Sequence, residues 1–247
     1  MARSENVPPI IHPIQVSAED MALPLANCFT LAKMWDGSAQ PAGDLVDQTI
    51  KREMERLFIE YRTYDQPTLV AAFQALLIYS IILLFPNPQK PSPGTFNQVT
   101  LIALQDLGCY VSETDFNLAP VTVHNRPTWD TWIIVNAKRR TLMALYCFEW
   151  MYARLNALPT YPCTEIGFMP GPAGKSTWGA RSRDEWECAY GRWLGRWAEG
   201  GFYTIKELAN VRPGPEIDAR TEMWLEEADE FGMMYMSLDK ISPPEAV

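Results

Sequence analysis

Apolar residues lie on one helical face in the stretch that begins at Asp44. The apolar positions of this face are Val46, Ile50, Met54, Leu57, Phe58 and Tyr61. Charged residues cover most of the opposite face, at Lys51, Arg52, Glu53, Glu55, Arg56 and Glu60. Because a single apolar stripe is typical of a helix with one buried side, the pattern predicts an amphipathic surface helix.

The next stretch, PTLVAAFQALLIYSIILLF at 67–85, carries no charge between Thr68 and Phe85. A bilayer core requires about 20 apolar residues, usually with basic or aromatic residues at the ends. This stretch contains Gln74 and Ser80 and lacks flanking cations. We therefore expect a central buried helix instead of a membrane span.

The same periodicity, with stop residues, predicts further helices at 25–35, 96–108, 128–158 and 183–199. Residues 160–180 are predicted to be irregular, and no run alternates like a strand. The sequence thus predicts an all-α fold, a single helical domain with a long central buried helix. Three segments are expected: an extended proline-rich N-terminal segment at 1–24, the helical domain at 25–212, and an acidic C-terminal helix or tail at 213–247.

The net charge of −9 argues against direct nucleic-acid binding, which requires clustered basic charge. Residues 213–247 contain nine acids and two basic residues. Trp224, Leu225 and Phe231 lie among these acids. We expect a terminal helix that packs one side on the core, and a partner-binding amphipathic helix is the alternative.

The N-terminus lacks the charged and then apolar plan of a signal peptide. The five cysteines are widely separated, with no C-x-x-C pair and no histidine at zinc spacing. We therefore expect an intracellular protein, in the nucleus or the cytoplasm and not secreted, with no metal, no cofactor and no membrane partner.

Familiar catalytic motifs are scarce. GFMPGPAGKST at 167–177 ends like a phosphate-binding loop, but Met169 occupies the position of the first glycine and two prolines remove N–H donors. His124 lies in a predicted loop, where a single histidine is more often structural than a catalytic base. These features favour a surface loop and a structural histidine.

The segment WIIVNAKRRTLMALYCFEWMYARLN at 132–156 places Lys138, Arg139 and Arg140 inside an aromatic, apolar run. Helical spacing puts Arg139 on a stripe with Trp132, Val135, Leu142 and Tyr146, so Arg139 is expected to point partly inward. Glu149 lies among aromatic residues, which can raise the pKa of a carboxyl group; a structural ion pair with an arginine is the alternative.

Four pieces of the chain carry a resemblance to a known family: PPIIHP (8–13), LPLANCFTLAKMW (23–35), REMERLFIEYRTYD (52–65) and WDTWIIVNAKRRTLMALYCFEWMYARLN (129–156). Over residues 8–197 their order and spacing resemble the regulatory, or middle homology, region of fungal-specific transcription factors with a binuclear zinc cluster. The resemblance implies an all-helical domain associated with regulation, dimer contacts and effector response. Many relatives have an acid where this chain has Asn136, and the cysteines of the zinc cluster are absent from this sequence.

Two functions from different classes follow. The first is a fungal transcription-factor-like regulatory protein without its own DNA-binding domain, which acts by binding an apolar small molecule, a protein partner or a second copy. The second is a stand-alone, cofactor-independent cyclase or isomerase of a fungal secondary-metabolite pathway, built on the same fold, with Glu149 and Arg139 as catalytic residues. A third hypothesis is a degenerate or truncated gene product that retains only a fragment of the helical fold. We favour the regulator, and in either case expect a ligand site lined by Trp132, Asn136, Arg139, Tyr146 and Glu149.

Overall fold

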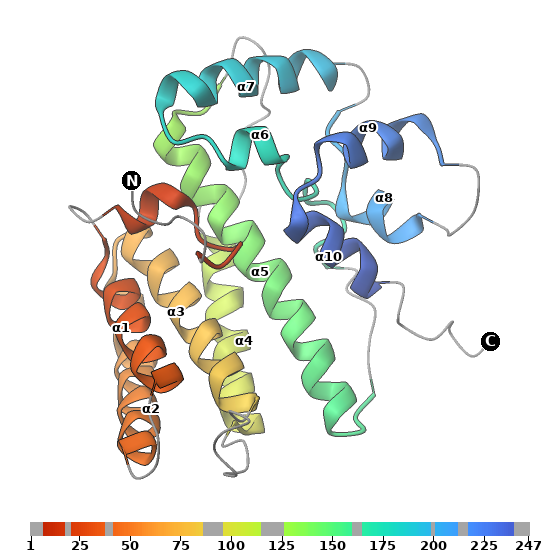
Figure 1. Ribbon diagram of the computed structural model, residues 1–247. Coiled ribbons are helices and arrows are strands. Elements are labelled where there is room, and N and C mark those ends of the chain that lie inside the picture. Colours follow the sequence, from red (N-terminus) through yellow and green to blue (C-terminus); the bar gives the residue numbers. More distant parts are fainter. Residues whose placement is uncertain are drawn as a thin grey trace. The chain divides into compact units, whose positions relative to one another are not determined.

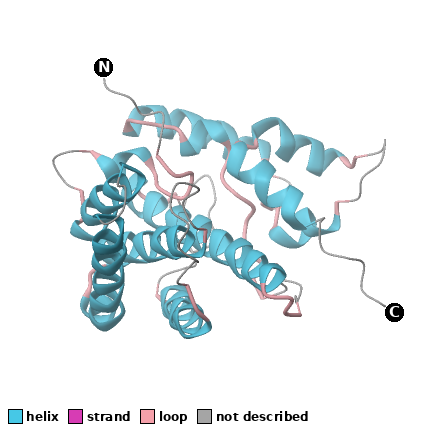
Figure 2. Ribbon diagram, turned by 60° about the horizontal axis from the view of Figure 1, so that its bottom comes forward, coloured by secondary structure: helices cyan, strands magenta, loops and turns pink. Residues whose placement is uncertain are grey.

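The computed structural model describes residues 7–17, 21–37, 42–85, 96–114, 126–159, 165–198, 201–211 and 217–239. Within these ranges the chain forms ten α-helices and two short 3-10 helices (Figure 1). The same ranges contain no strand (Figure 2), and one isolated bridge joins Pro170 and Thr204. The predicted all-α fold is confirmed.

The helices belong to two compact units. One unit consists of residues 14–116, and the other consists of residues 1–13 together with 117–247. The sequence places its boundaries elsewhere, after residues 24 and 212, and that three-part division stays a prediction. Each unit is described by itself.

The unit formed by residues 14–116 contains α1 (Leu23–Gly37), α2 (Ala42–Glu60), α3 (Gln66–Leu84) and α4 (Gln98–Glu113). Helix α3 packs against each of the other three. Most of the predicted apolar stripe is buried, at Val46, Ile50, Met54 and Leu57 of α2 and at Tyr61, which follows α2 directly. Arg56 pairs with Glu53 and Glu60 on the more polar side, as expected for an amphipathic helix.

Helix α3 is the predicted central buried helix. The Asp65 side chain accepts a hydrogen bond from the Thr68 backbone N–H, and Pro67 occupies the first turn. The two polar side chains of this apolar run, Gln74 and Ser80, are buried. Gln74 exchanges amide hydrogen bonds with Gln15, and the Ser80 hydroxyl donates to the Leu76 carbonyl. Among the described residues, Gln66–Leu84 is the one helix long and apolar enough to cross a membrane, and 67% of its most apolar window is buried within the protein.

The second unit contains α5 (Trp129–Leu155), α6 (Lys175–Trp178), α7 (Arg183–Arg196), α8 (Ile205–Asn210), α9 (Ala219–Glu227) and α10 (Glu230–Asp239). Helix α5 is the long helix of this unit, and it packs against α7 and α10. Helix α6 packs against α7, and α8 packs against α10. The C-terminal helices bury Trp224 and Phe231 and expose Glu222 and Glu226, as expected of a segment that packs one side on the core.

Three elements differ from the sequence prediction. The segment predicted to be irregular at 160–180 contains α6, a single turn that is too short to show a periodic apolar pattern. Helix α8 is not predicted at all, for the same reason. Helix α4 continues past the predicted end at Gly108 to Glu113, because Gly108 is buried inside the helix instead of ending it.

Candidate functional site

The three consecutive cations of α5 lie inside the protein. The exposed fraction of the residue is 0% for Lys138, 9% for Arg139 and 1% for Arg140. Helix α5 begins after Thr128, whose hydroxyl accepts a hydrogen bond from the Thr131 backbone N–H. Because the middle of this helix is buried on every side, all three cations are withdrawn from solvent.

The Arg140 guanidinium joins four segments of the unit. It donates hydrogen bonds to the backbone carbonyl of Pro9 (3.1 Å) and to that of Ala173 (2.8 Å). Its Nη2 lies 2.6 Å from the Asp229 carboxylate, at the start of α10. Burial lowers the pKa of Arg140, and the Asp229 charge and hydrogen bond act in the opposite direction. A fully buried cation thus holds the N-terminal segment, the loop before α6 and the C-terminal helix together.

Aromatic rings complete the surroundings of Arg140. Its guanidinium carbon lies 4.1 Å from the centre of the Trp178 ring and 5.1 Å from that of Phe231. Both distances fall within the range of cation–π attraction. This contact is stronger in a site shielded from water, as here, than on a surface.

His12 lies against the same aromatic cluster and is fully buried. The centre of its ring is 5.0 Å from that of Trp178 and 6.5 Å from those of Trp129 and Trp132, in each case edge to face. Burial, and next the positive charge of Arg140, lower the pKa of His12 to about 4. His12 is therefore neutral at physiological pH and packs as an aromatic ring.

Trp132, Asn136 and Arg139, three of the residues predicted to line a ligand site, lie together in the structure. Trp132 is buried, and the centre of its ring lies 6.1 Å from that of Tyr190 in α7. Arg139 interacts electrostatically with the same Tyr190, and burial lowers the pKa of Arg139 to about 10, so it keeps its charge at neutral pH. Asn136 donates its side-chain amide to the Trp132 carbonyl (2.8 Å). These groups meet within a packed aromatic interior.

The other two predicted site residues, Tyr146 and Glu149, are half-buried in the second half of α5. The predicted ligand site, with Trp132, Asn136, Arg139, Tyr146 and Glu149 as its wall, stays a prediction. His124 lies outside the described residues.

Sequence reasoning missed Arg140 and His12. Helical spacing predicts Arg139 as the inward-facing cation. A helix that is buried on every side has no polar face, so the spacing cannot distinguish Arg139 from Arg140. His12 lies in the proline-rich N-terminal segment, which carries no helical periodicity. A usable signal was its position inside PPIIHP, where apolar residues surround a single imidazole.

A surface depression lies between α8 and α9. Its volume is about 460 Å³, and it is lined by Tyr203, Glu207, Asn210, Val211, Ile217, Asp218 and Thr221. Thr204 and Glu207 form a reciprocal cap of α8, and the Arg220 Nε donates to the same Glu207 carboxylate at 2.7 Å. Burial raises the pKa of Glu207, but the hydrogen bonds from Arg220 and Thr204 outweigh it and hold the pKa below its usual value.

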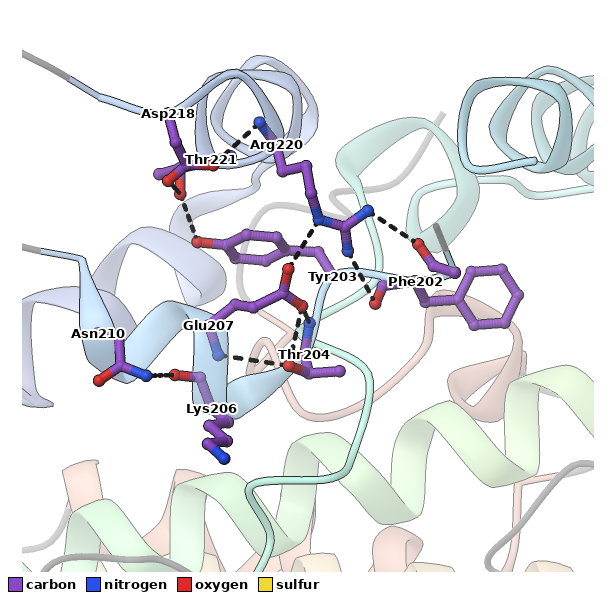
Figure 3. Close-up of polar contacts among 10 residues, drawn as sticks. Phe202, Tyr203, Thr204, Lys206, Glu207, Asn210, Asp218, Arg220 and Thr221 are labelled. Atoms are coloured by element: carbon purple, nitrogen blue, oxygen red, sulfur yellow. Dashed lines mark hydrogen bonds and ion pairs between the residues drawn. The ribbon is translucent and has the colours of Figure 1, made fainter. Parts of the chain in front are cut away.

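Hydroxyl groups line the other side of this depression. The Tyr203 and Thr221 oxygens lie 2.7 Å apart, and the Thr221 hydroxyl is 2.6 Å from the Asp218 carboxylate (Figure 3). The acids of the depression are therefore engaged in capping and ion pairing. The rim that is left for a ligand is polar and contains two apolar residues, Val211 and Ile217.

A second, more open depression of about 600 Å³ lies along α6 and α7. Its lining includes Lys175, Asp184, Cys188 and Arg192, and Arg192 Nη1 approaches the Cys188 sulfur at 3.4 Å. Within the part of the chain that the structure describes, no three His, Cys, Asp or Glu side chains are grouped as metal ligands would be.

Comparisons with family models, with curated proteins and with solved structures found no match for this chain.

Proposed function

We propose that the chain is a regulatory binding protein of the fungal transcription-factor type and does not itself bind DNA. The observation that carries the proposal is the burial of Lys138, Arg139 and Arg140. In a helix that bound nucleic acid these cations would face solvent, since neutralising phosphates requires exposed basic side chains. Here all three are buried, and Arg140 joins four segments of a helical unit.

The charge of the exposed surface supports a partner other than nucleic acid. Helices α9 and α10 expose Glu222, Glu226 and Glu230, and the whole chain has a net charge of −9. An acidic surface repels phosphate backbones and attracts basic or polar groups. A protein or a small molecule is therefore the partner that this surface favours.

The depression between α8 and α9 is a second reason to propose ligand binding. Its volume of about 460 Å³ falls in the range of small-molecule sites. The capping and ion-pair contacts of Glu207 fix one wall, so that a ligand would meet a preformed surface.

A gel-shift titration with the isolated chain tests the first part of the proposal. We expect no retardation of a defined duplex beyond the weak, non-specific level. Tight binding that weakens steeply with added salt would contradict the proposal, because such binding requires exposed cations. The regulatory role predicts altered transcripts when the gene is deleted.

The cyclase or isomerase alternative rests on Arg139, which keeps its charge in an aromatic interior beside Tyr190. The two roles separate in one experiment on deletion strains complemented with Glu149→Gln or, as an exposed control, Glu226→Gln. In a regulator, any effect of Glu149→Gln on metabolites comes together with altered transcripts, whereas Glu226→Gln restores the transcripts. Accumulation of a pathway intermediate with Glu149→Gln alone, at unchanged transcript levels, would establish the enzyme instead.

A further inference from the structure

The Arg140 guanidinium is surrounded by two kinds of partner. The body of the unit supplies the carbonyls of Pro9 and Ala173 and the ring of Trp178. The start of the C-terminal helix supplies the Asp229 carboxylate and the Phe231 ring. We name the first group, with Arg140 itself, the Arg140 socket, and the segment 229–239 the C-terminal plug.

The plug presents a defined recognition motif. One Asp229 oxygen accepts the Gly232 N–H at 2.9 Å and caps α10, while the other lies 2.6 Å from the Arg140 guanidinium. Phe231 is 1% exposed, and its ring lies beside the same guanidinium. A helix that begins with Asp-x-Phe therefore delivers a capping carboxylate and a ring to one cation.

Side chains farther along the plug differ in exposure, and Tyr235 is 7% exposed. Met233 and Met234 are 40% and 43% exposed. An isolated helix as short as α10 is marginal in water, so α10 keeps its form through the surface it docks on. A short helix that depends on docking for its form can open locally before the rest of a protein unfolds.

If the plug left the Arg140 socket, another carboxylate and ring could take the places of Asp229 and Phe231. With the plug docked, Arg140 is 1% exposed, and a buried charge that loses its counter-ion is costly. A carboxylate that also caps a helix, followed two residues later by an aromatic ring, satisfies the guanidinium in the same way as the plug does.

We propose that the Arg140 socket is a docking site for a partner helix that begins with Asp-x-aromatic, and that the C-terminal plug holds this site closed until the partner displaces it. The inference rests on the proposed binding role and adds to it the chemistry of the partner. Its test uses neither DNA nor transcripts, so its failure is distinct from a failure of the regulatory proposal.

The test uses the full-length chain and a fluorescent peptide with the sequence of residues 218–239. In the variant Asp229→Asn/Phe231→Ala the plug is weakened, and Glu230→Gln changes the neighbouring exposed acid as a matched control. Because the plug competes with the peptide, we expect the double variant to bind the peptide about tenfold or more tightly than the wild type and the control do. A peptide with Asn in place of the first residue of its Asp-x-Phe motif should lose that gain.

Equal peptide binding by the wild type and by a double variant that melts cooperatively would overturn the proposal. Should the double variant not fold, hydrogen exchange of the wild type decides: amides of α10 must exchange by local opening before those of α5, and faster still with excess peptide. Exchange of α10 only together with α5 would overturn it. The proposal would also be overturned if the wild type formed a dimer and the double variant did not. A second copy of the chain would then occupy the socket.

Discussion

Arg140 of α5 and Asp229 at the start of α10 form an ion pair of 2.6 Å whose cation is 1% exposed. Surface pairs contribute little to stability, since water screens both charges, whereas a buried charge that loses its partner costs several kcal/mol. The unit of residues 1–13 and 117–247 therefore depends on this one contact more than on its exposed ion pairs.

Asp229→Asn should lower the free energy of unfolding by about 3 kcal/mol, because the buried guanidinium loses its counter-charge. The control is Asp130→Asn, which breaks the exposed pair of Arg183 and Asp130, where the side chains are 59% and 73% exposed. That change should cost less than about 1 kcal/mol. Urea denaturation of both variants measures the difference, and equal losses would contradict the structural role of Arg140.

His12 makes stability depend on pH. Its pKa is lowered by burial to about 4 in the folded chain, from 6.5 in the unfolded chain. The unfolded chain therefore binds the proton first. The contribution of His12 to stability is complete above pH 6.5 and is lost as the pH falls toward about 4.

We expect wild-type stability to fall by about 2 kcal/mol from this residue between pH 6.5 and about 5. The variant His12→Gln should show a much smaller slope over the same interval, even if it is less stable at neutral pH. Carboxyl groups with lowered pKa, such as Glu53 and Glu207, lose their contribution at lower pH. Identical slopes for variant and wild type would show that His12 is not buried as a neutral group.

The sequence predicts those parts of the fold that depend on nearest neighbours along the chain. The stripe from Val46 to Tyr61 and the uncharged run at 67–85 define α2 and α3, because a periodic or continuous apolar pattern extends over several turns. Helix α8 has a single complete signal, the Thr204 and Glu207 capping box, which indicates where a helix begins even when it is too short for periodicity.

The contacts of the candidate site could not be predicted in this way. Arg140 meets Pro9, Ala173 and Asp229, which lie in segments far apart along the chain. His12 meets Trp178 for the same reason. Each contact is a consequence of tertiary packing, and the local sequence around Arg139 and Arg140 is equally compatible with either cation as the central one.

Two glycines near the end of α7 should respond to alanine in opposite directions. Gly195 lies in the helix with open space where a Cβ would be added, so Gly195→Ala should raise stability by about 0.5 kcal/mol. Gly201 has a φ of +73°, which strains any residue with a Cβ, so Gly201→Ala should lower stability by about 1 kcal/mol. Thermal denaturation of the two variants measures the signs, and a loss for Gly195→Ala would contradict the open surface.

The cysteines should differ widely in reactivity. Cys109 and Cys188 are exposed, whereas Cys28 and Cys147 are buried. Burial raises the pKa of Cys28 to about 12, so very little reactive thiolate forms there at neutral pH. A short pulse of iodoacetamide, followed by mass spectrometry of the peptides, should label Cys188 at least about 100-fold faster than Cys28. In denaturant the rates of these two thiols should converge, and equal rates in the native chain would show that the surroundings of Cys28 are open to solvent.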